Sequence, residues 1–159
     1  MAKKSPRHLS RSLAIQGIYY HQINQGSVAE IEDFLSKTCA TVYPIANYEL
    51  LHFLLEHSIN QFEHMLNLYT EYSEREIEQI NLIERAILVL AAVELTDNLS
   101  VPTPVIINEA IELAKLYGAE ESYKFINNLL KIVIIIFSKS SKLDIDLTLT
   151  YLYALFLHI

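Results

Sequence analysis

The chain of 159 residues is long enough for one domain with its own core, and its hydrophobic content of 52% excludes disorder for the chain as a whole. Its single cysteine excludes an internal disulfide and a cysteine-rich metal site, and its three isolated glycines form none of the phosphate-binding loops of dehydrogenases and nucleotide hydrolases. The net charge of −7 is uneven: residues 1–29 hold four Lys and Arg and no acid, so the remaining residues carry −11.

Three helices are predicted before residue 70. The first has an apolar stripe with steps of three and four residues, formed by Leu9, Leu13, Gly17 and Tyr20. Ser27 and Glu30 form a capping-box pattern that begins a second helix, which ends near residue 40, before the break at Pro44. Asn47 begins a third, long helix that reaches Leu66.

A turn is predicted at residues 69–73, and the fourth helix follows it. Ser73 and Glu76 have the spacing of a second capping box, and apolar positions continue from there to Val93. Six helices in all, three on either side of this turn, predict an all-α fold of two small bundles packed together. The expected helical domain covers residues 1–131, with subdomains at about 1–70 and 73–131.

Two helices are predicted after the prolines that follow the fourth helix. Thr103 as N-cap and Pro104 at the first helical position begin a fifth helix, residues 105–117. Gly118 is expected in the left-handed conformation that often ends a helix. A sixth helix is predicted over residues 121–130.

The end of the chain, residues 132–159, has a different pattern. Residues 132–137 are a solid apolar block, and alternation over residues 143–149 is as typical of a strand as of a helix. No window has the apolar length of a membrane span, and the N-terminus lacks the apolar run of a signal peptide. We therefore expect a cytoplasmic protein with no membrane contact and a hydrophobic tail of unknown role.

The histidines do not form a recognisable metal site. Glu49 and His52 are one Glu-x-x-His pair, whereas di-iron bundles need two such pairs and further carboxylates. His57 and His64 share a helix face, but no H-E-x-x-H motif is present. No G-x-S-x-G motif occurs and Cys39 has no catalytic signature, so we predict no metal, no cofactor and no catalytic residues.

The first helix carries a different signal. Arg7 and Arg11 are four residues apart, so both guanidinium groups are expected on one face, away from the apolar stripe, with Tyr19 at the edge of that face. Cations beside an aromatic ring suit single-stranded RNA, whose phosphates attract the charge and whose unpaired bases stack on the ring. A solvated basic tail and a tyrosine at the edge of the core are the alternatives.

Other polar positions allow simple structural interpretations. Glu121 complements the dipole at a helix N-terminus, Lys124 is expected as a solvated cation and Phe125 as a core residue. On the fourth helix, the apolar spacing leaves Glu78 and Glu84 on the polar side, where solvated glutamates are expected.

Five segments stand out in chain order: RHLSRSLAIQGIY at 7–19, IERAIL at 83–88, VEL at 93–95, VIINEAIELAK at 105–115 and KFIN at 124–127. In sequence and in order they resemble the NusB family of bacterial transcription antitermination factors, and the first resembles the family's opening. The resemblance covers about residues 7–131. It implies an all-helical fold of two three-helix bundles and no catalysis.

The resemblance also implies partners and sites. Members of the family pair with the small-subunit ribosomal protein NusE, bind the boxA element of nascent rRNA transcripts, and work within an RNA polymerase antitermination complex. Carried over by position, the RNA-binding residues are Lys3, Lys4, Arg7, Arg11, Gln16, Tyr19, Glu121, Lys124 and Phe125. Glu84 and Glu78 are carried over as the acidic surface that faces the basic partner.

The chain departs from the family pattern at three places. It has Ser12 where a glutamate is common, it is poorer in arginine near the N-terminus, and residues 127–131 lack the family's aspartate. The pattern is lost after about Val133, which a frame shift at that aspartate would explain. A similar helical domain precedes the catalytic domain of an rRNA cytosine methyltransferase, but the chain is too short to include that second domain. An RNA-binding or protein-only adaptor in rRNA biogenesis is the other alternative.

Overall fold

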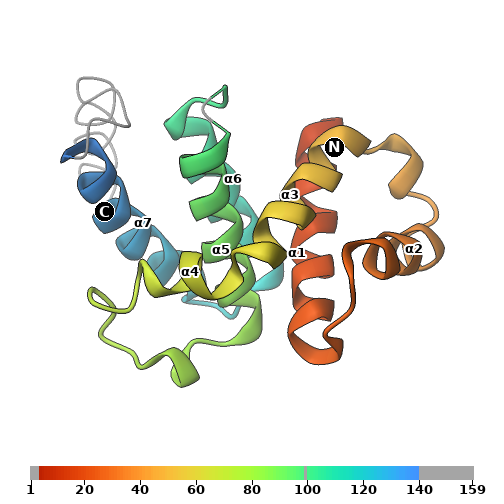
Figure 1. Ribbon diagram of the computed structural model, residues 1–159. Coiled ribbons are helices and arrows are strands. Elements are labelled where there is room, and N and C mark those ends of the chain that lie inside the picture. The colour runs from red at the N-terminus through yellow and green to blue at the C-terminus, as the bar shows by residue number, and fades with distance from the viewer. Residues whose placement is uncertain (1–3, 99, 140–159) are drawn as a thin grey trace.

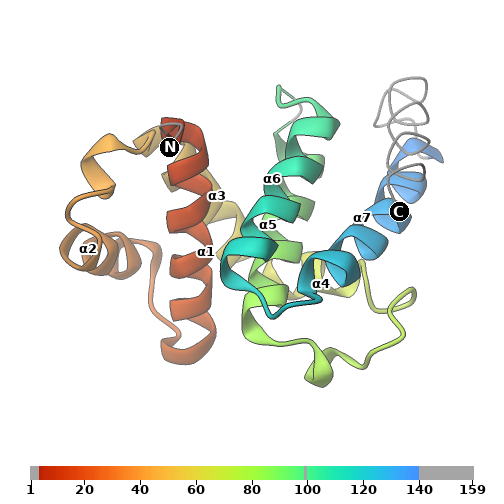
Figure 2. The same cartoon turned by 180° about the vertical axis from the view of Figure 1, so that it is seen from behind.

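The computed structural model describes residues 4–98 and 100–139, and every regular element in these ranges is a helix (Figures 1 and 2). The predicted all-α class is confirmed. The α-helices are α1 (Pro6–Asn24), α2 (Val28–Thr38), α3 (Tyr48–Asn60), α4 (Phe62–Asn67), α5 (Leu82–Asp97), α6 (Thr103–Tyr117) and α7 (Ser122–Lys139). Two short 3₁₀ helices, η1 (Tyr43–Ile45) and η2 (Ile77–Gln79), lie in the connections.

Six of the seven α-helices that the structure describes form two groups of three. Helices α1, α2 and α3 all contact one another, and so do α5, α6 and α7. Helix α5 of the second group also packs against α1 and α3 of the first group and against α4. It therefore forms the contact between the two groups and has a central position, as Figure 1 shows. The prediction of two small bundles packed together is therefore confirmed, whereas the exact subdomain boundaries stay a prediction.

Helix α5 forms the centre of the core. Every residue from Ala86 to Leu95 is buried, because this segment is apolar on all sides apart from Glu94 and has neighbouring helices on several sides. Burial of this apolar surface is the main force that holds the two bundles together. The buried Tyr69 hydroxyl donates to the Leu88 carbonyl oxygen at 2.9 Å, which satisfies the one polar group that this ring brings into the core.

Several predicted helix starts are confirmed. Ser27 and Glu30 form the complete capping box at the start of α2, with the Ser27 backbone N–H donating to the Glu30 carboxylate at 2.8 Å. The Asn47 side chain accepts from the Leu50 backbone N–H at 2.8 Å and begins α3. These side chains satisfy amide groups that have no partner within the helix.

Two predicted helices begin or end elsewhere. The long third helix is divided at Gln61 into α3 and α4. The fourth helix begins at Leu82 rather than Ser73, because the capping box that forms is Asn81 with Glu84. The Ser73 hydroxyl instead accepts from the Arg75 backbone N–H at 3.1 Å and donates to the Arg75 carbonyl at 2.8 Å, which shapes a turn.

Gly118 differs from its expected conformation. Its φ of −79° and ψ of 171° place it in the extended region, so the expectation of a left-handed conformation is wrong. The position has little room for a side chain: a Cβ there would lie 2.6 Å from the Ala114 carbonyl oxygen and from the Ser122 Cβ. A close approach between the end of α6 and the start of α7 is thus the constraint at this glycine.

Helix α7 continues past the expected domain limit at residue 131, and Val133 and Ile134 are buried in the core. The strand-or-helix expectation for residues 143–149 lies outside the described residues. Within the part of the chain that the structure describes, none of the helices has the length and hydrophobicity needed to cross a membrane.

Candidate nucleic-acid interface

The start of α1 presents two exposed cations. Ser5 caps this helix by accepting from the His8 backbone N–H at 3.1 Å, so Lys4 precedes the helix and Arg7 lies in its first turn. Both residues are exposed, and neither has a hydrogen-bond or ion-pair partner among the described residues. Lys3, which was predicted with them, lies outside the described residues.

Other cations of the described chain are already engaged. Three exposed ion pairs join Lys37 to Asp33 at 2.6 Å, Lys115 to Glu112 at 3.6 Å and Lys124 to Glu121 at 2.7 Å. The Arg85 guanidinium donates to the carbonyl oxygens of Ile77 and Ile80 at 2.7 and 2.8 Å. The unpaired charges of Lys4 and Arg7 are therefore a distinct feature of a chain whose net charge is −7.

Arg11 does not lie on this exposed surface, so the expectation that it shares an open face with Arg7 is wrong. Its side chain is buried, and its Nε and Nη2 donate to the two carboxylate oxygens of Glu94 at 2.7 and 2.8 Å. Burial by itself lowers the pKa of Arg11, but the hydrogen bonds and charge of Glu94, with the charge of Glu109, outweigh it and raise that pKa above its ordinary value. Arg11 is thus a structural cation that joins α1 to α5.

Gln16 is also mostly occupied within the protein. Its amide nitrogen donates to the Tyr117 hydroxyl at 3.2 Å and to the Ser12 carbonyl at 3.3 Å, and Ser12 itself hydrogen-bonds to Tyr117. These contacts tie α1 to the end of α6. They also give Ser12, where the family pattern has a glutamate, a partner on α6.

Tyr19, three residues after Gln16, is 38% exposed. Together with Asn81, Ile83 and Ala119 it lines an open cleft of about 360 Å³ between α1, the start of α5 and the connection from α6 to α7. An aromatic ring on the wall of such a cleft is accessible for stacking.

The start of α7 carries the other predicted contact residues. Glu121 and Lys124 are exposed, and the hydrogen bond and charge of Glu121 raise the pKa of Lys124. Phe125 is half-buried, and the guanidinium carbon of Arg75 lies 4.0 Å from its ring centroid. Arg75 was missed by sequence reasoning, and its only signal is that it is a single cation within an acidic segment, residues 71–78.

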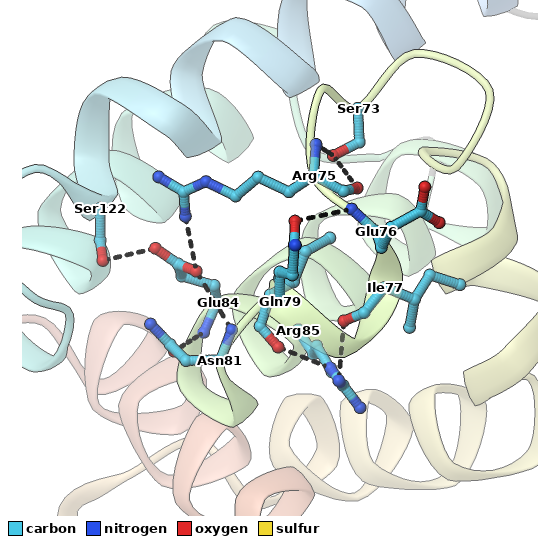
Figure 3. A network of polar contacts seen from close by, with 10 residues as sticks. Ser73, Arg75, Glu76, Ile77, Gln79, Asn81, Glu84, Arg85 and Ser122 are labelled. Carbon is cyan, nitrogen blue, oxygen red and sulfur yellow. Dashed lines mark hydrogen bonds and ion pairs between the residues drawn. The ribbon is translucent and has the colours of Figure 1, made fainter.

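Glu84 is buried, so the expectation of a solvated side chain at this position is wrong. One carboxylate oxygen accepts from the Ser122 hydroxyl at 2.7 Å. The other accepts from the Asn81 backbone N–H at 3.2 Å and lies 3.4 Å from Arg75 Nη1, as Figure 3 shows. Glu78, in contrast, is exposed on η2.

Comparison with known proteins decides the family. The model of the NusB family matches residues 8–134, which is most of the chain.

The chain belongs to the NusB family.

Two similar NusB relatives are transcription antitermination proteins by name. The protein from Burkholderia lata is 41% identical over 128 residues, which cover 80% of this chain and 87% of the relative. The protein from Aromatoleum aromaticum is 37% identical over 130 residues, covering 82% and 88%. Among solved structures, NusB of T. maritima matches with a TM-score of 0.69 and 25% identity, over 82% of this chain and 92% of that one. The family match ends at residue 134, close to Val133, where the NusB pattern was expected to be lost.

Proposed function

We propose that this protein is a non-catalytic transcription antitermination factor that binds single-stranded boxA-type RNA of nascent rRNA transcripts together with the small-subunit ribosomal protein NusE. Family membership and the names of the similar proteins support the antitermination role. The RNA-binding part of the proposal rests on the residues of this chain.

The observation that carries the proposal is the pair of unpaired cations at the start of α1. Lys4 and Arg7 are exposed and have no partner among the described residues, so no internal ion pair has to be broken before they meet phosphate. Contacts of this kind release counterions from the nucleic acid, which supplies a large share of the affinity of proteins for it. Lys3 adds a third charge in the sequence next to them.

Two aromatic groups are included in the proposed RNA surface. Tyr19 lines the cleft between α1, α5 and the α6–α7 connection, and Phe125 follows at the start of α7. Each ring can stack on an unpaired base at a gain of about 1–3 kcal/mol. Lys124 and Glu121 flank Phe125 and can contact phosphate and base edges, respectively.

The acidic remainder of the chain accounts for the second partner. A body with a charge of −11 repels RNA unless a basic protein covers part of it, and a small ribosomal protein has the required charge. The exposed Glu78 belongs to the surface that we propose for NusE and the antitermination complex. Glu84 is not included, because its carboxylate is buried and hydrogen-bonded.

The test compares two variants in the binding of labelled single-stranded rRNA-leader RNA by fluorescence anisotropy, with and without NusE. Lys4→Ala with Arg7→Ala should weaken RNA binding and reduce the slope of log affinity against log salt by about 0.7 for each phosphate that the variant no longer neutralises. Lys37→Ala, which removes an exposed cation on α2 that is paired with Asp33, is the control and should leave both values unchanged.

Binding of NusE separates the proposal from the protein-only adaptor. The Lys4 and Arg7 double variant should retain full affinity for NusE, because these residues lie on the proposed RNA surface. Wild-type protein that binds NusE but no leader RNA, alone or as the heterodimer, would contradict the proposal and favour the adaptor.

A further inference from the structure

A second cleft, lined by aromatic side chains and by charges of both signs, lies at the start of α7, opposite the turn that precedes η2. It has a volume of about 360 Å³, which is in the range of small-ligand sites, and Tyr72, Arg75, Lys124 and Phe125 contribute to its walls. Tyr72 is 42% exposed and the Arg75 side chain is exposed to the same degree. Residues from two segments far apart in the sequence therefore present two rings and two cations around one hollow.

Arg75 is held in one orientation in this cleft. Its guanidinium carbon lies 4.0 Å from the centroid of the Phe125 ring, which is the geometry of a cation–π contact. Its Nη1 lies 3.4 Å from Glu84 Oε2, and its backbone N–H and carbonyl are both hydrogen-bonded to the Ser73 hydroxyl. Figure 3 shows the Arg75 side chain extended from the turn across to Glu84.

The carboxylate that holds Arg75 is itself fixed on two sides. The Ser122 hydroxyl donates to Glu84 Oε1 at 2.7 Å, and the Asn81 backbone N–H donates to Oε2 at 3.2 Å. Glu84 therefore connects the turn before η2, the start of α5 and the start of α7. Its burial leaves it no direct contact with a ligand, but any change in its charge or position is transmitted to Arg75.

We infer that Arg75 is an RNA-contacting residue whose planar guanidinium stacks on an unpaired base in this cleft, and that Glu84 is the positioning residue that sets its plane. The inference rests on the proposed RNA-binding function. Guanidinium groups stack on bases as aromatic rings do, and a side chain fixed before binding loses less entropy when the base arrives.

The charges of the cleft favour a base rather than a phosphate as the group that Arg75 meets. The cations Arg75 and Lys124 are balanced by Glu74 and Glu121, which also line the cleft, and Arg75 is already paired with Glu84. A nearly neutral, partly aromatic cleft attracts phosphate weakly, whereas stacking does not depend on net charge. Arg75 and Arg7 should therefore contribute to RNA affinity in ways that salt can distinguish.

The test measures affinity for the labelled single-stranded leader RNA over a range of salt concentrations. Arg75→Ala should weaken binding on the order of tenfold while leaving the slope against log salt nearly unchanged, since it removes stacking and not a free charge. Arg75→Lys keeps the positive charge but lacks the planar guanidinium that stacks on a base, so its affinity for RNA should fall to a similar extent. Arg7→Ala should instead reduce the slope by about 0.7.

Glu84→Gln keeps the size of the side chain and an oxygen that can accept from Ser122, but it removes the charge opposite Arg75. We expect it to weaken RNA binding to about the same extent as Arg75→Ala, and the double variant should be no weaker than either single one. This non-additivity is not expected from a general loss of stability, which urea unfolding of each variant measures separately.

Two outcomes would overturn the inference. Unchanged affinity in Arg75→Ala would remove Arg75 from the RNA surface, and a reduction of the salt slope equal to that of Arg7→Ala would make it a phosphate contact. Both are distinct from a failure of the proposed function, in which the wild-type protein itself would bind no leader RNA.

Discussion

Arg11 of α1 and Glu94 of α5 form a buried ion pair in which two guanidinium nitrogens donate to the two carboxylate oxygens at 2.7 and 2.8 Å. The pair lies where the first bundle meets the central helix. A cation that belongs by sequence to the basic N-terminal region thus serves to hold two helices together, whereas Lys4 and Arg7 of the same region are exposed.

Loss of Arg11 should be costly for stability. Arg11→Met retains much of the side-chain volume but leaves the Glu94 carboxylate buried without its partner, which typically costs about 3–5 kcal/mol. Urea unfolding followed by circular dichroism measures the difference. Arg7→Met, on the exposed side of the same helix, should change the free energy of unfolding by less than about 0.5 kcal/mol. Equal effects of the two changes would contradict the buried pair.

Gly17 is predicted to tolerate no side chain. A Cβ at this position would lie 2.6 Å from Leu55 Cδ2 and 2.8 Å from Ile31 Cγ2, where α1 packs closely on α2 and α3. Gly17→Ala should therefore destabilise the protein by about 1–3 kcal/mol through overpacking, despite the better helix propensity of alanine. Gly26→Ala is the control, because the closest atom to its Cβ is Tyr20 Cε1 at 3.1 Å. A thermal melt in which Gly17→Ala is as stable as wild type would show that the three helices are more loosely packed.

Asn81, which caps α5, should contribute more to stability than Ser73, where the sequence predicted the start of this helix. Asn81 caps the helix by accepting from the Glu84 backbone N–H at 2.9 Å, so Asn81→Ala should cost about 1 kcal/mol. Ser73→Ala should cost less, because the Ser73 hydroxyl stabilises an exposed turn rather than a helix end. Denaturant midpoints of the two variants measure the difference, and the reverse order would place the functional cap at Ser73.

Asp97 makes part of the stability depend on acid pH. Burial by itself raises the pKa of Asp97, but hydrogen bonds from Gln61, His57 and Thr96 and the charge of His57 outweigh it, so its pKa lies below the ordinary 3.8. A lowered folded-state pKa means that the stabilisation is present above pH 3.8 and is lost as the pH falls through the folded-state value.

The difference in unfolding free energy between wild type and Asp97→Asn should therefore be larger just above the ordinary pKa of 3.8 than below it, and should shrink as the pH falls through the folded-state pKa. Urea titrations at several pH values measure it. Glu56→Gln, an exposed acid with no partner among the described residues, should show no such pH-dependent difference. A constant difference for Asp97→Asn across this range would contradict the pKa assignment.

The fold could be predicted largely because the caps and the apolar spacing agree. Ser27 and Asn47 begin helices where the sequence indicates, since both the polar cap and the apolar run that follows are local signals. The prediction that Ser73 begins a helix was wrong because a serine hydroxyl can also close a turn. The choice between turn and helix depends on how the segment packs. The break at Gln61 has no local breaker residue and is set by the packing of α4 on α5.

The site could be predicted less well, and the errors at Arg11 and Glu84 have a common cause. Spacing along one helix shows which face is apolar, but not whether another helix covers the polar face. A signal was nevertheless present: Glu94 is the only acid in the buried run from Ala86 to Leu95, and Arg11 lies between Ser10 and Ser12, whose small side chains permit close approach. Opposite charges in two such segments indicate a buried pair.

The central position of α5 has a consequence for how the two halves of the molecule depend on each other. Neither group of three helices can be separated from the other without uncovering one side of the run from Ala86 to Leu95, a strip of apolar surface that would cause aggregation in water. The two groups of helices are thus portions of one cooperative unit, and neither group is expected to fold stably by itself.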